Sequence, residues 1–579
     1  MILETLVRHY ENLAKQGSVS KLGWCQAKVS YGINLTKDGT VKEILSLKHE
    51  EERGKKKVLQ PAQKSVPQMV TRSSGVAANY LCDNSKYLLG IDKDESSGRV
   101  QDCFLAAKEK HLKLLQNVDS TMANAVRTYF ETWNPSQASE NALIREHWDE
   151  ITDGGNLIFC MNEEEAQDDA AIRAGWDETQ TGDDQKTDGI CMVTGKPAEI
   201  SRIHRTIKGV PGAQSSGAAL VSFNAPAFES YGKEQSYNAP VGRYAEFAYT
   251  TALNYLLDQN KYRLQLGDTM IVYWAESGQE ACQKAFSFVI TPNHDNQREI
   301  QKVFDGLQKQ KYIDLDDIEI DPEQKFYILG IAPNAARLSV RFFYEDSFGN
   351  ILENIAAHYR NMDIVKPKWE EREYLGVREM LDETANQKSK DKKPVPNMAA
   401  MVMQAVISGD RYPASLFTDL LIRIRAEQGT VTWGRAAMIK AYLIRNCNWE
   451  KGENYMGLNK ESRDKAYVLG RLFAVLESIQ KDANPEIKAT IRDRYFNSAC
   501  ATPAVVFPVL IKLKNSHIKK LEREKTKLKD DYEELLAEIM DKLEEETSFP
   551  LRLTLEEQGK FDLGYYHQMQ EKYKKREDK

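Results

Sequence analysis

The sequence lacks several features that would assign a protein class at once. Its eight cysteines are scattered without a CxxC pair, which excludes the common zinc-ribbon layout and gives no disulfide framework. No apolar run approaches the length of a membrane span. The net charge of −7 excludes a whole-surface polycation that would hold nucleic acid by charge alone. Any contact with nucleic acid must therefore come from local patches.

Enzyme signatures are also missing. The stretch from Gly189 to Lys196 looks like a phosphate-binding loop, but five residues separate its glycines instead of four. In addition, Pro197 stands where Ser or Thr must hold magnesium. The order of residues indicates no Ser/His/Asp or Cys/His arrangement and no carboxylates at metal-ligand spacing. We therefore expect a protein that is not an enzyme, with no cofactor and no metal.

Length and composition are those of an ordinary globular protein. A chain of 579 residues, 41% hydrophobic and 28% charged, is long enough for about three or four domains. Its first residues form an amphipathic helical pattern with acids and bases interspersed, unlike a signal peptide. Together with the unpaired cysteines, this predicts a cytoplasmic protein that does not associate with membranes.

The first two thirds of the chain mix helical and strand patterns. Cys25–Leu35 and Val41–Leu47 flank a Lys-Asp-Gly turn and predict a hairpin. The charged stretch Glu50–Pro67 is interpreted as an exposed loop, and Tyr244–Leu257 as a helix. Further strands are predicted at Leu220–Phe223, Met270–Trp274, Phe286–Ile290, Phe326–Ile331 and Leu338–Tyr344.

The last third is helical in pattern. Asp382–Asn397 is rich in Lys, Ser and Pro, with little to bury, and is interpreted as a linker. A long helix near Thr502–Glu546 has a basic first half and an acidic second half. The predicted fold is α+β. It has a mixed α/β region at 1–382, possibly of two subdomains, a linker at 383–397 and an all-helical bundle at 398–579.

Seven stretches carry a resemblance to one family. They are CMVTG (Cys191–Gly195), IKGVPGAQSSGAALVSFN (Ile207–Asn224), AFESYGKEQ (Ala227–Gln235), NAP (Asn238–Pro240), RSSGVAANYLCDNSKYLLG (Arg72–Gly90), FYILGIAPNAARLSVRFF (Phe326–Phe343) and YVLGRLFAVLESIQ (Tyr467–Gln480). In sequence and in order they resemble the large subunit of type I-C CRISPR surveillance (Cascade) complexes.

The resemblance implies a recognition subunit without catalytic residues. Such a subunit recognises the short PAM motif on target duplex DNA, helps to form the R-loop and recruits a helicase-nuclease. The implied partners are double-stranded target DNA, CRISPR RNA through the assembled complex, the Cascade backbone and RNA-end-capping subunits, and a small helical subunit. The resemblance also implies an internal start that yields such a small subunit, for which Met456 is a plausible position.

Two loops are candidate DNA contacts. In the first, small residues let the backbone approach a duplex, while Arg and Asn bond to base edges; alternatively, its arginine pairs with an acid and its asparagines cap turns. The candidate DNA- or PAM-binding residues of this loop are Lys64, Arg72, Ser73, Ser74, Gly75, Asn79 and Asn84.

The second candidate concentrates neutral amides and hydroxyls, which suit a minor-groove contact or a strand-separating wedge. Its alternative interpretation is an Ω-type loop whose glycines only form tight turns. The candidate residues are Lys208, Gln214, Ser215, Ser216, Lys233, Gln235 and Asn238.

Two weaker candidates carry basic side chains. The strand Arg337–Tyr344 places two arginines beside an aromatic ring, although a partly solvated sheet face explains it equally well. The basic helix near the C-terminus could guide a displaced strand, or be a solvated face paired with neighbouring acids. Its candidate residues are Lys512, Lys514, Lys519, Lys520 and Arg523.

An alternative class of function is a divergent metal-dependent nuclease or RNA-processing enzyme. Asp183, Asp184, Asp188 and His204 would then contribute to a two-metal site. Otherwise His204, a single histidine among basic residues, is expected to contact phosphate or a turn, or to be exposed. A third class is a pure scaffold.

Overall fold

The chain forms two compact units. The first consists mainly of Leu3–Arg205 and Phe223–Ala252, and the second of Thr206–Ser222 and Leu253–Lys579. The computed structural model describes residues 1–53, 56–70, 75–93, 98–181, 188–293, 295–308, 313–315, 318–386, 390, 394–395, 397–449, 452–543 and 549–577.

A mixed sheet lies at the centre of the first unit. Its strand order is β2-β1-β7-β6, with β5 also beside β1 and β8 beside β7. The strands are β1 (Trp24–Leu35), β2 (Val41–Ser46), β5 (Ala62–Pro67), β6 (Cys82–Asp83), β7 (Asn156–Met161) and β8 (Glu164–Glu165). The antiparallel pairing of β1 with β2 confirms the predicted hairpin, and Gly39 supplies the positive φ that its turn requires.

The predicted loop at Glu50–Pro67 is wrong. The stretch contains β3 (His49–Arg53) and β4 (Lys56–Gln60), which pair as an antiparallel hairpin, followed by β5. Strand β5 then pairs with the first half of β1, and Val66 is fully buried there. The stretch lacks the alternation of apolar and polar residues typical of a strand, but backbone pairing does not depend on it.

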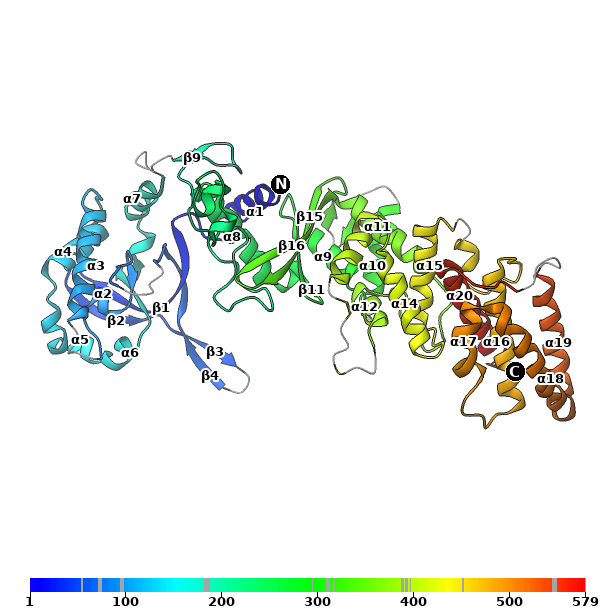
Figure 1. Ribbon diagram of the computed structural model, residues 1–579. Coiled ribbons are helices and arrows are strands. Elements are labelled where there is room, and N and C mark those ends of the chain that lie inside the picture. The colour runs from blue at the N-terminus through cyan, green and yellow to red at the C-terminus, as the bar shows by residue number, and fades with distance from the viewer. Residues whose placement is uncertain are drawn as a thin grey trace. The chain divides into compact units, whose positions relative to one another are not determined.

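Helices cover this sheet. Figure 1 shows α2, α3 and α4 beside β1 and β2, where Tyr129, Phe130 and Phe159 form one aromatic cluster. The helices of this part of the chain, not all of which touch the sheet, are α1 (Ile2–Lys15), α2 (Ser85–Leu88), α3 (Arg99–Leu115), α4 (Thr121–Thr132), α5 (Ala142–Arg145), α6 (Trp148–Thr152), α7 (Ala170–Thr181) and α8 (Arg243–Asp258), whose last residues belong to the second unit. Helix α8 confirms the predicted helix at Tyr244–Leu257, and its N-terminal half packs through Phe247 against Tyr10 of α1.

Two two-residue strands, β9 (Gly189–Ile190) and β10 (Pro197–Ala198), pair in the first unit. They precede an irregular segment that contains two short 3-10 helices, η3 (Pro226–Phe228) and η4 (Gln235–Asn238). Because this segment has few ladder hydrogen bonds, its shape depends on side-chain bonds.

The second unit begins with an antiparallel sheet of order β11-β12-β15-β16. The strands are β11 (Arg263–Leu266), β12 (Thr269–Ala275), β15 (Lys325–Asn334) and β16 (Arg337–Ser347), with β13 (Ile313–Leu315) and β14 (Ile318–Ile320) as a separate pair. They confirm the predicted strands at Met270–Trp274, Phe326–Ile331 and Leu338–Tyr344.

Two other predicted strands are wrong. Phe286–Ile290 is the end of helix α9 (Glu280–Ile290), whose buried residues recur at helical spacing. A short apolar run does not distinguish a strand from a buried helix. Leu220–Phe223 has no strand, although the preceding Ala219 bridges to Arg337 of β16.

Helices form the rest of the second unit. They are α10 (Gln297–Gln308), α11 (Phe348–Met362), α12 (Val377–Thr384), α13 (Met398–Ser408), α14 (Ala414–Ala426), α15 (Trp433–Cys447), α16 (Lys465–Ala483), α17 (Ile491–Ala501), α18 (Pro503–Glu524), α19 (Thr526–Asp541) and α20 (Leu555–Glu577). One hydrophobic core runs through them and continues onto the sheet. The mixed α/β first part and helical second part confirm the predicted α+β fold.

The predicted boundaries fall at identifiable places. Most of the predicted linker lies between α12 and α13, where residues 387–389, 391–393 and 396 are outside the described residues. The predicted long helix near Thr502–Glu546 is two helices, α18 and α19, which meet at Lys525.

Met456 lies before α16, and its carbonyl accepts a hydrogen bond from the Val365 N–H. In the part of the chain that the structure describes, no helix is long and apolar enough to span a membrane.

Helices α16 and α20 cross in backbone contact. A Cβ atom added at Gly470 would lie 2.0 Å from the Phe561 carbonyl oxygen, and one at Gly564 would lie 2.0 Å from the Tyr467 carbonyl oxygen. Only glycine permits this approach, which explains the glycine in the YVLG stretch.

Candidate nucleic-acid interface

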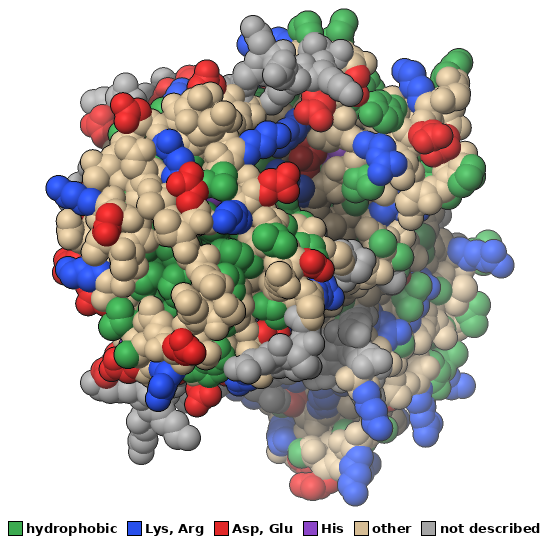
Figure 2. All heavy atoms as spheres, turned by 90° about the vertical axis from the view of Figure 1, so that its left-hand side faces the viewer, with side chains coloured by type: hydrophobic (Ala, Val, Ile, Leu, Met, Phe, Trp, Pro, Cys, Tyr) green, Lys and Arg blue, Asp and Glu red, His purple; other side chains and the backbone are tan. Residues whose placement is uncertain are grey.

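Charge is mixed on the surface of the first unit. Figure 2 shows basic and acidic side chains interspersed over much of the face toward the viewer, while Lys and Arg side chains are more frequent toward its lower right. A duplex is held by clustered cations and hydrogen-bond donors. The search for a nucleic-acid interface therefore turns to individual loops and helix faces.

The Gly/Ser/Gln loop is a closed loop of the second unit, residues 207–218. Ile207 and Ala218 exchange backbone hydrogen bonds of 2.8 and 2.9 Å at its base. Gly217 has a φ of +98°, and a Cβ there would lie 2.7 Å from the Thr206 Cβ atom. The Lys208 N–H donates to the Asn254 side chain over 2.8 Å, so the base of the loop is fixed.

The tip of this loop is open to solvent. Lys208, Gln214, Ser215 and Ser216 are exposed, and the backbone bond from the Gly217 N–H to the Gln214 carbonyl shapes the tip as a turn. The loop thus presents one amide and two hydroxyls in this turn, and Lys208 adds a cation beside its base. Such groups donate to and accept from base edges and phosphate oxygens.

A second turn, residues 229–238 of the first unit, contains the remaining candidates of this set. The Asn238 side chain accepts from the Ser230 N–H (2.8 Å) and donates to the carbonyls of Lys233 (2.7 Å) and Gln235 (2.9 Å). The Glu229 carboxylate accepts from the Gln235 N–H over 3.0 Å. The Asn238 side chain therefore holds the turn together, while the Lys233 side chain is exposed.

The structure thus divides the second candidate set between the two compact units. Lys208, Gln214, Ser215 and Ser216 share the 207–218 loop, whereas Lys233, Gln235 and Asn238 share the 229–238 turn. They are two candidate surfaces, each of which has to be tested by itself.

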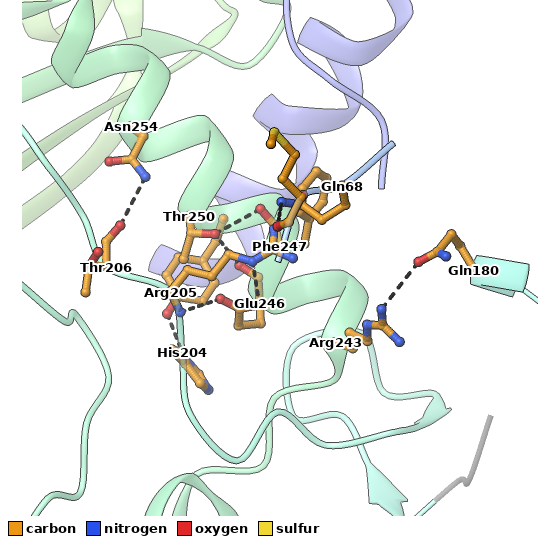
Figure 3. Close-up of polar contacts among 12 residues, drawn as sticks. Gln68, Gln180, His204, Arg205, Thr206, Arg243, Glu246, Phe247, Thr250 and Asn254 are labelled. Carbon is orange, nitrogen blue, oxygen red and sulfur yellow. Dashed lines mark hydrogen bonds and ion pairs between the residues drawn. The ribbon is translucent and has the colours of Figure 1, made fainter. Parts of the chain in front are cut away.

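His204 and Arg205 are bound to α8. Figure 3 shows both residues beside Glu246, whose carboxylate accepts from the Arg205 N–H over 2.7 Å. The Arg205 guanidinium lies 4.6 Å from the centre of the Phe247 ring. Burial raises the pKa of Glu246, and Arg205 opposes this shift. Arg205 is therefore partly neutralised within the first unit and is a weaker candidate for phosphate.

Of the alternatives considered for His204, exposure is wrong. His204 is only 4% exposed and its Nδ1 is hydrogen-bonded to the Tyr249 hydroxyl over 2.7 Å. Burial lowers its pKa to about 4, so that the ring is neutral near pH 7. The basic residues around His204 suggested an exposed segment, and nothing in the sequence indicated that α8 covers this histidine.

The first candidate set, near Arg72, has mainly internal partners where the structure describes it. Lys64 on β5 forms an ion pair with Glu165. Asn79 is 1% exposed and accepts from the Val70 N–H over 2.9 Å. Asn84 caps α2 by accepting from the Lys86 N–H. These contacts match the alternative interpretation, in which the asparagines serve turns.

The centre of that loop is a different case. Gly75 is exposed with a φ of +88°, and a Cβ there would meet no atom within 4 Å. Arg72, Ser73 and Ser74 lie outside the described residues, so their part in PAM recognition stays a prediction.

The basic residues near the C-terminus lie on α18. Lys512, Lys519, Lys520 and Arg523 are exposed and Lys514 is half-buried. At 100° per residue, Lys512, Lys519 and Arg523 fall on one face of the helix. Lys520 donates to the Asn484 side chain over 3.1 Å. This face therefore presents three exposed cations along the helix.

A cavity of about 430 Å³ lies near that helix, between α16, α19 and α20. Five carboxylates line it: Asp482, Asp531, Glu534, Glu538 and Glu571. Lys572 also lines the cavity and forms a 3.2 Å ion pair with Asp482. The remaining excess of carboxylates disfavours phosphate there.

The Arg341 side chain of β16 has an internal partner. Arg341 forms a 3.0 Å ion pair with Asp268, and Phe343 stacks on Tyr327 with ring centres 6.2 Å apart. A partly solvated sheet face accounts for this strand.

Of the four residues of the alternative metal site, two have internal partners and two lie outside the described residues. Asp188 accepts from the Ile200 N–H (2.7 Å) and from the Tyr237 hydroxyl (3.3 Å), and His204 is buried on α8. Asp183 and Asp184 lie outside the described residues. Among the residues that the structure does describe, no group of three or more His, Cys, Asp or Glu side chains is arranged to hold a metal ion.

Sequence reasoning missed one residue, Tyr231. Its side chain is 100% exposed and its φ is +55°. The sequence Ser-Tyr-Gly-Lys could have drawn attention to it. A two-residue turn of this kind ordinarily has Asn-Gly or Gly-Gly at its centre, and here Tyr stands in the first of these two positions.

Comparison with protein families finds a match over nearly the whole chain. A family model described as CRISPR-associated protein (Cas_Csd1) matches residues 6–573. Comparison with curated proteins finds no match.

Proposed function

Because the chain belongs to the CRISPR-associated protein family Cas_Csd1, we propose that it is the large subunit of a type I-C, CRISPR-RNA-guided surveillance complex. In this role it recognises the PAM on target duplex DNA, aids R-loop formation and recruits the helicase-nuclease. The observation that carries the proposal is the extent of the match, which includes both compact units. The remaining partners are the guide RNA, held through the assembled complex, the Cascade backbone and RNA-end-capping subunits, and a small helical subunit. The protein itself is proposed to be non-catalytic and cytoplasmic.

The 207–218 loop is the best described candidate for a duplex contact. Its base is fixed by the Ile207–Ala218 bonds, while Gln214, Ser215 and Ser216 remain exposed. A preorganised loop loses little conformational entropy on binding. Neutral amide and hydroxyl groups read shape and hydrogen-bond pattern rather than charge. The loop therefore suits a check on a short motif before guide pairing begins.

The exposed face of α18 is the proposed contact for the displaced strand. Lys512, Lys519 and Arg523 are one to three helical turns apart on this face. A single strand bound there would release condensed counterions, so that affinity would fall steeply with salt. Motif reading and strand holding would then occupy different parts of the chain.

The experiment is PAM-dependent retention of a labelled duplex by the reconstituted complex with guide RNA. The test variant replaces Gln214, Ser215 and Ser216 by Ala. We expect it to weaken binding of the PAM duplex by about 5- to 150-fold if one base contact of about 1–3 kcal/mol is lost, and to reduce discrimination against a duplex with an altered PAM.

A matched control replaces Gln137 and Ser139, which are exposed on the 3-10 helix η1 (Pro135–Glu140), by Ala. This control should bind like the wild type. Wild-type complex that retains duplexes with and without a PAM equally would contradict the proposed function. An unchanged loop variant in an otherwise PAM-dependent complex would move motif reading elsewhere in the chain.

The enzyme alternative is tested with the purified chain, magnesium and a labelled duplex. The proposal expects intact DNA. Cleavage that is abolished by Asp183→Ala would establish the nuclease instead.

A further inference from the structure

The side chain of Tyr231 is fully exposed at the tip of the 229–238 turn. Ser230 and Lys233 face each other as an isolated bridge, with a 3.1 Å bond from the Lys233 N–H to the Ser230 carbonyl. Tyr231 and Gly232 are the two central residues, with φ of +55° and +68°. The ring therefore gains no packing within the described part of the chain.

A tyrosine is an unfavourable choice for this backbone. Two central residues with positive φ define a type I′ turn, which prefers Asn, Asp or Gly. A side chain with a Cβ is strained in the left-handed region, and Asn tolerates it better than Tyr. Since neither burial nor turn chemistry favours Tyr231, its presence indicates a contact with something outside the chain.

The turn holds the ring in one place. Asn238 makes three hydrogen bonds to the backbone of Ser230, Lys233 and Gln235. The Ser236 N–H donates to the Arg202 carbonyl over 3.3 Å, which ties the turn to the preceding segment. A ring that is already positioned loses little entropy when a flat partner stacks on it.

The surroundings of the ring favour a nucleobase as the partner. The neighbours of the ring along the turn are Ser230, Gly232, Lys233 and Glu234, none of which is a large apolar residue. Phe228, which is 42% exposed, lies just before the turn, but a protein interface would require a larger apolar patch around the ring. Every nucleobase has an aromatic face and is followed by a phosphate, for which the exposed Lys233 is a partner. Because Glu234 is also exposed, charge is nearly balanced, and stacking would provide most of the affinity.

We propose that Tyr231 is a stacking residue that holds an unpaired nucleobase on the 229–238 turn. The proposal rests on the proposed function, because guide pairing leaves one DNA strand unpaired. It deepens that function by naming an aromatic contact to a base, independent of the loop at residues 207–218. Such a contact tolerates any base sequence.

The test uses the assembled complex and duplexes carrying 2-aminopurine, a base whose fluorescence is quenched by stacking, at successive positions of an unpaired bubble. A single-stranded RNA with the same label distinguishes an RNA base from a DNA base. Tyr231→Asn suits the turn, so we expect an unchanged or slightly raised melting temperature. Binding of the bubble duplex should be about 5- to 150-fold weaker, which corresponds to about 1–3 kcal/mol for one stacked base.

Three further measurements make the test specific. Tyr231→Trp should retain quenching. Trp369→Ala, which removes an aromatic ring that is 78% exposed in the second unit, should bind like the wild type. The loss in Tyr231→Asn should be the same at low and high salt, because a stacking contact releases few counterions.

The outcomes separate the two proposals. Wild-type complex without PAM-dependent binding contradicts the proposed function and the stacking proposal with it. PAM-dependent binding in which Tyr231→Asn quenches and binds like the wild type overturns the stacking proposal alone. Loss of binding with a lowered melting temperature in Tyr231→Asn, without rescue by Tyr231→Trp, would show a structural role and also overturn it.

Discussion

Replacing Gly470 by Ala should loosen the helical end of the second unit. The added methyl group would lie 2.0 Å from the Phe561 carbonyl oxygen, whereas a carbon and a carbonyl oxygen in contact are about 3.3–3.6 Å apart. Helices α16 and α20 would therefore have to separate by about 1.3 Å at this point. Neither helix can bend locally without losing neighbouring backbone bonds.

The magnitude follows from what the crossing contains. Overpacking costs about 1–3 kcal/mol, while alanine returns about 1 kcal/mol of helix propensity. The separation also stretches two buried bonds, Tyr467 to His567 (2.8 Å) and Tyr565 to Glu477 (2.6 Å). Each buried group left without a partner costs a further ~1–3 kcal/mol. If both bonds are lost, we expect a net destabilisation of about 2–8 kcal/mol.

The assay is urea unfolding combined with hydrogen exchange of peptides from α16 and α20. Exchange reports the helical end directly, even if the two compact units unfold separately. The matched control is Gly457→Ala, because a Cβ at Gly457 meets no atom within 4 Å. This control should change stability by no more than about 0.5 kcal/mol. An unfolding midpoint and exchange pattern of Gly470→Ala equal to those of the wild type would refute the crossing.

Three other predictions concern pH, the 229–238 turn and the α18 face. Burial lowers the pKa of His567 to about 3 from 6.5, so the unfolded chain binds the extra proton between these values and stability falls with falling pH, by up to about 1.4 kcal/mol per unit. The urea midpoint of His567→Gln should therefore depend less on pH from 7 to 5, and an identical dependence would contradict this. Asn238→Ala removes three hydrogen bonds and should speed exchange in peptides covering 229–238, by the equivalent of about 2–3 kcal/mol; unchanged exchange would show that the turn does not need it. Replacing Lys512, Lys519 and Arg523 by Gln should reduce the salt slope of single-strand binding by about 2, whereas Lys42→Gln with Lys113→Gln, which are exposed on β2 and α3, should not.

Part of the fold was predictable because it is encoded locally. The Lys-Asp-Gly turn specifies the β1–β2 hairpin. Short apolar runs rich in β-branched and aromatic residues predicted β12 and β15, which are buried almost throughout, and β16 beside them. The wrong strand at Phe286–Ile290 shows the limit of this approach, since a run of apolar residues is compatible with a strand and with the buried end of α9. The β3–β4 hairpin was missed because its residues carry no strand periodicity.

The α+β class, the helical second part and the family could be predicted from the sequence, since they depend on short-range periodicity and on contiguous motifs. Which polar side chains have partners inside the protein could be learned only from the three-dimensional fold. Lys64 pairs with Glu165, 101 positions away, and His204 is covered by α8. A buried polar group takes its hydrogen-bond partner from whichever residues lie near it in space, and these can be far away along the chain. The fold likewise leaves the side chains of Gln214 and Tyr231 exposed to solvent, where a partner molecule can reach them.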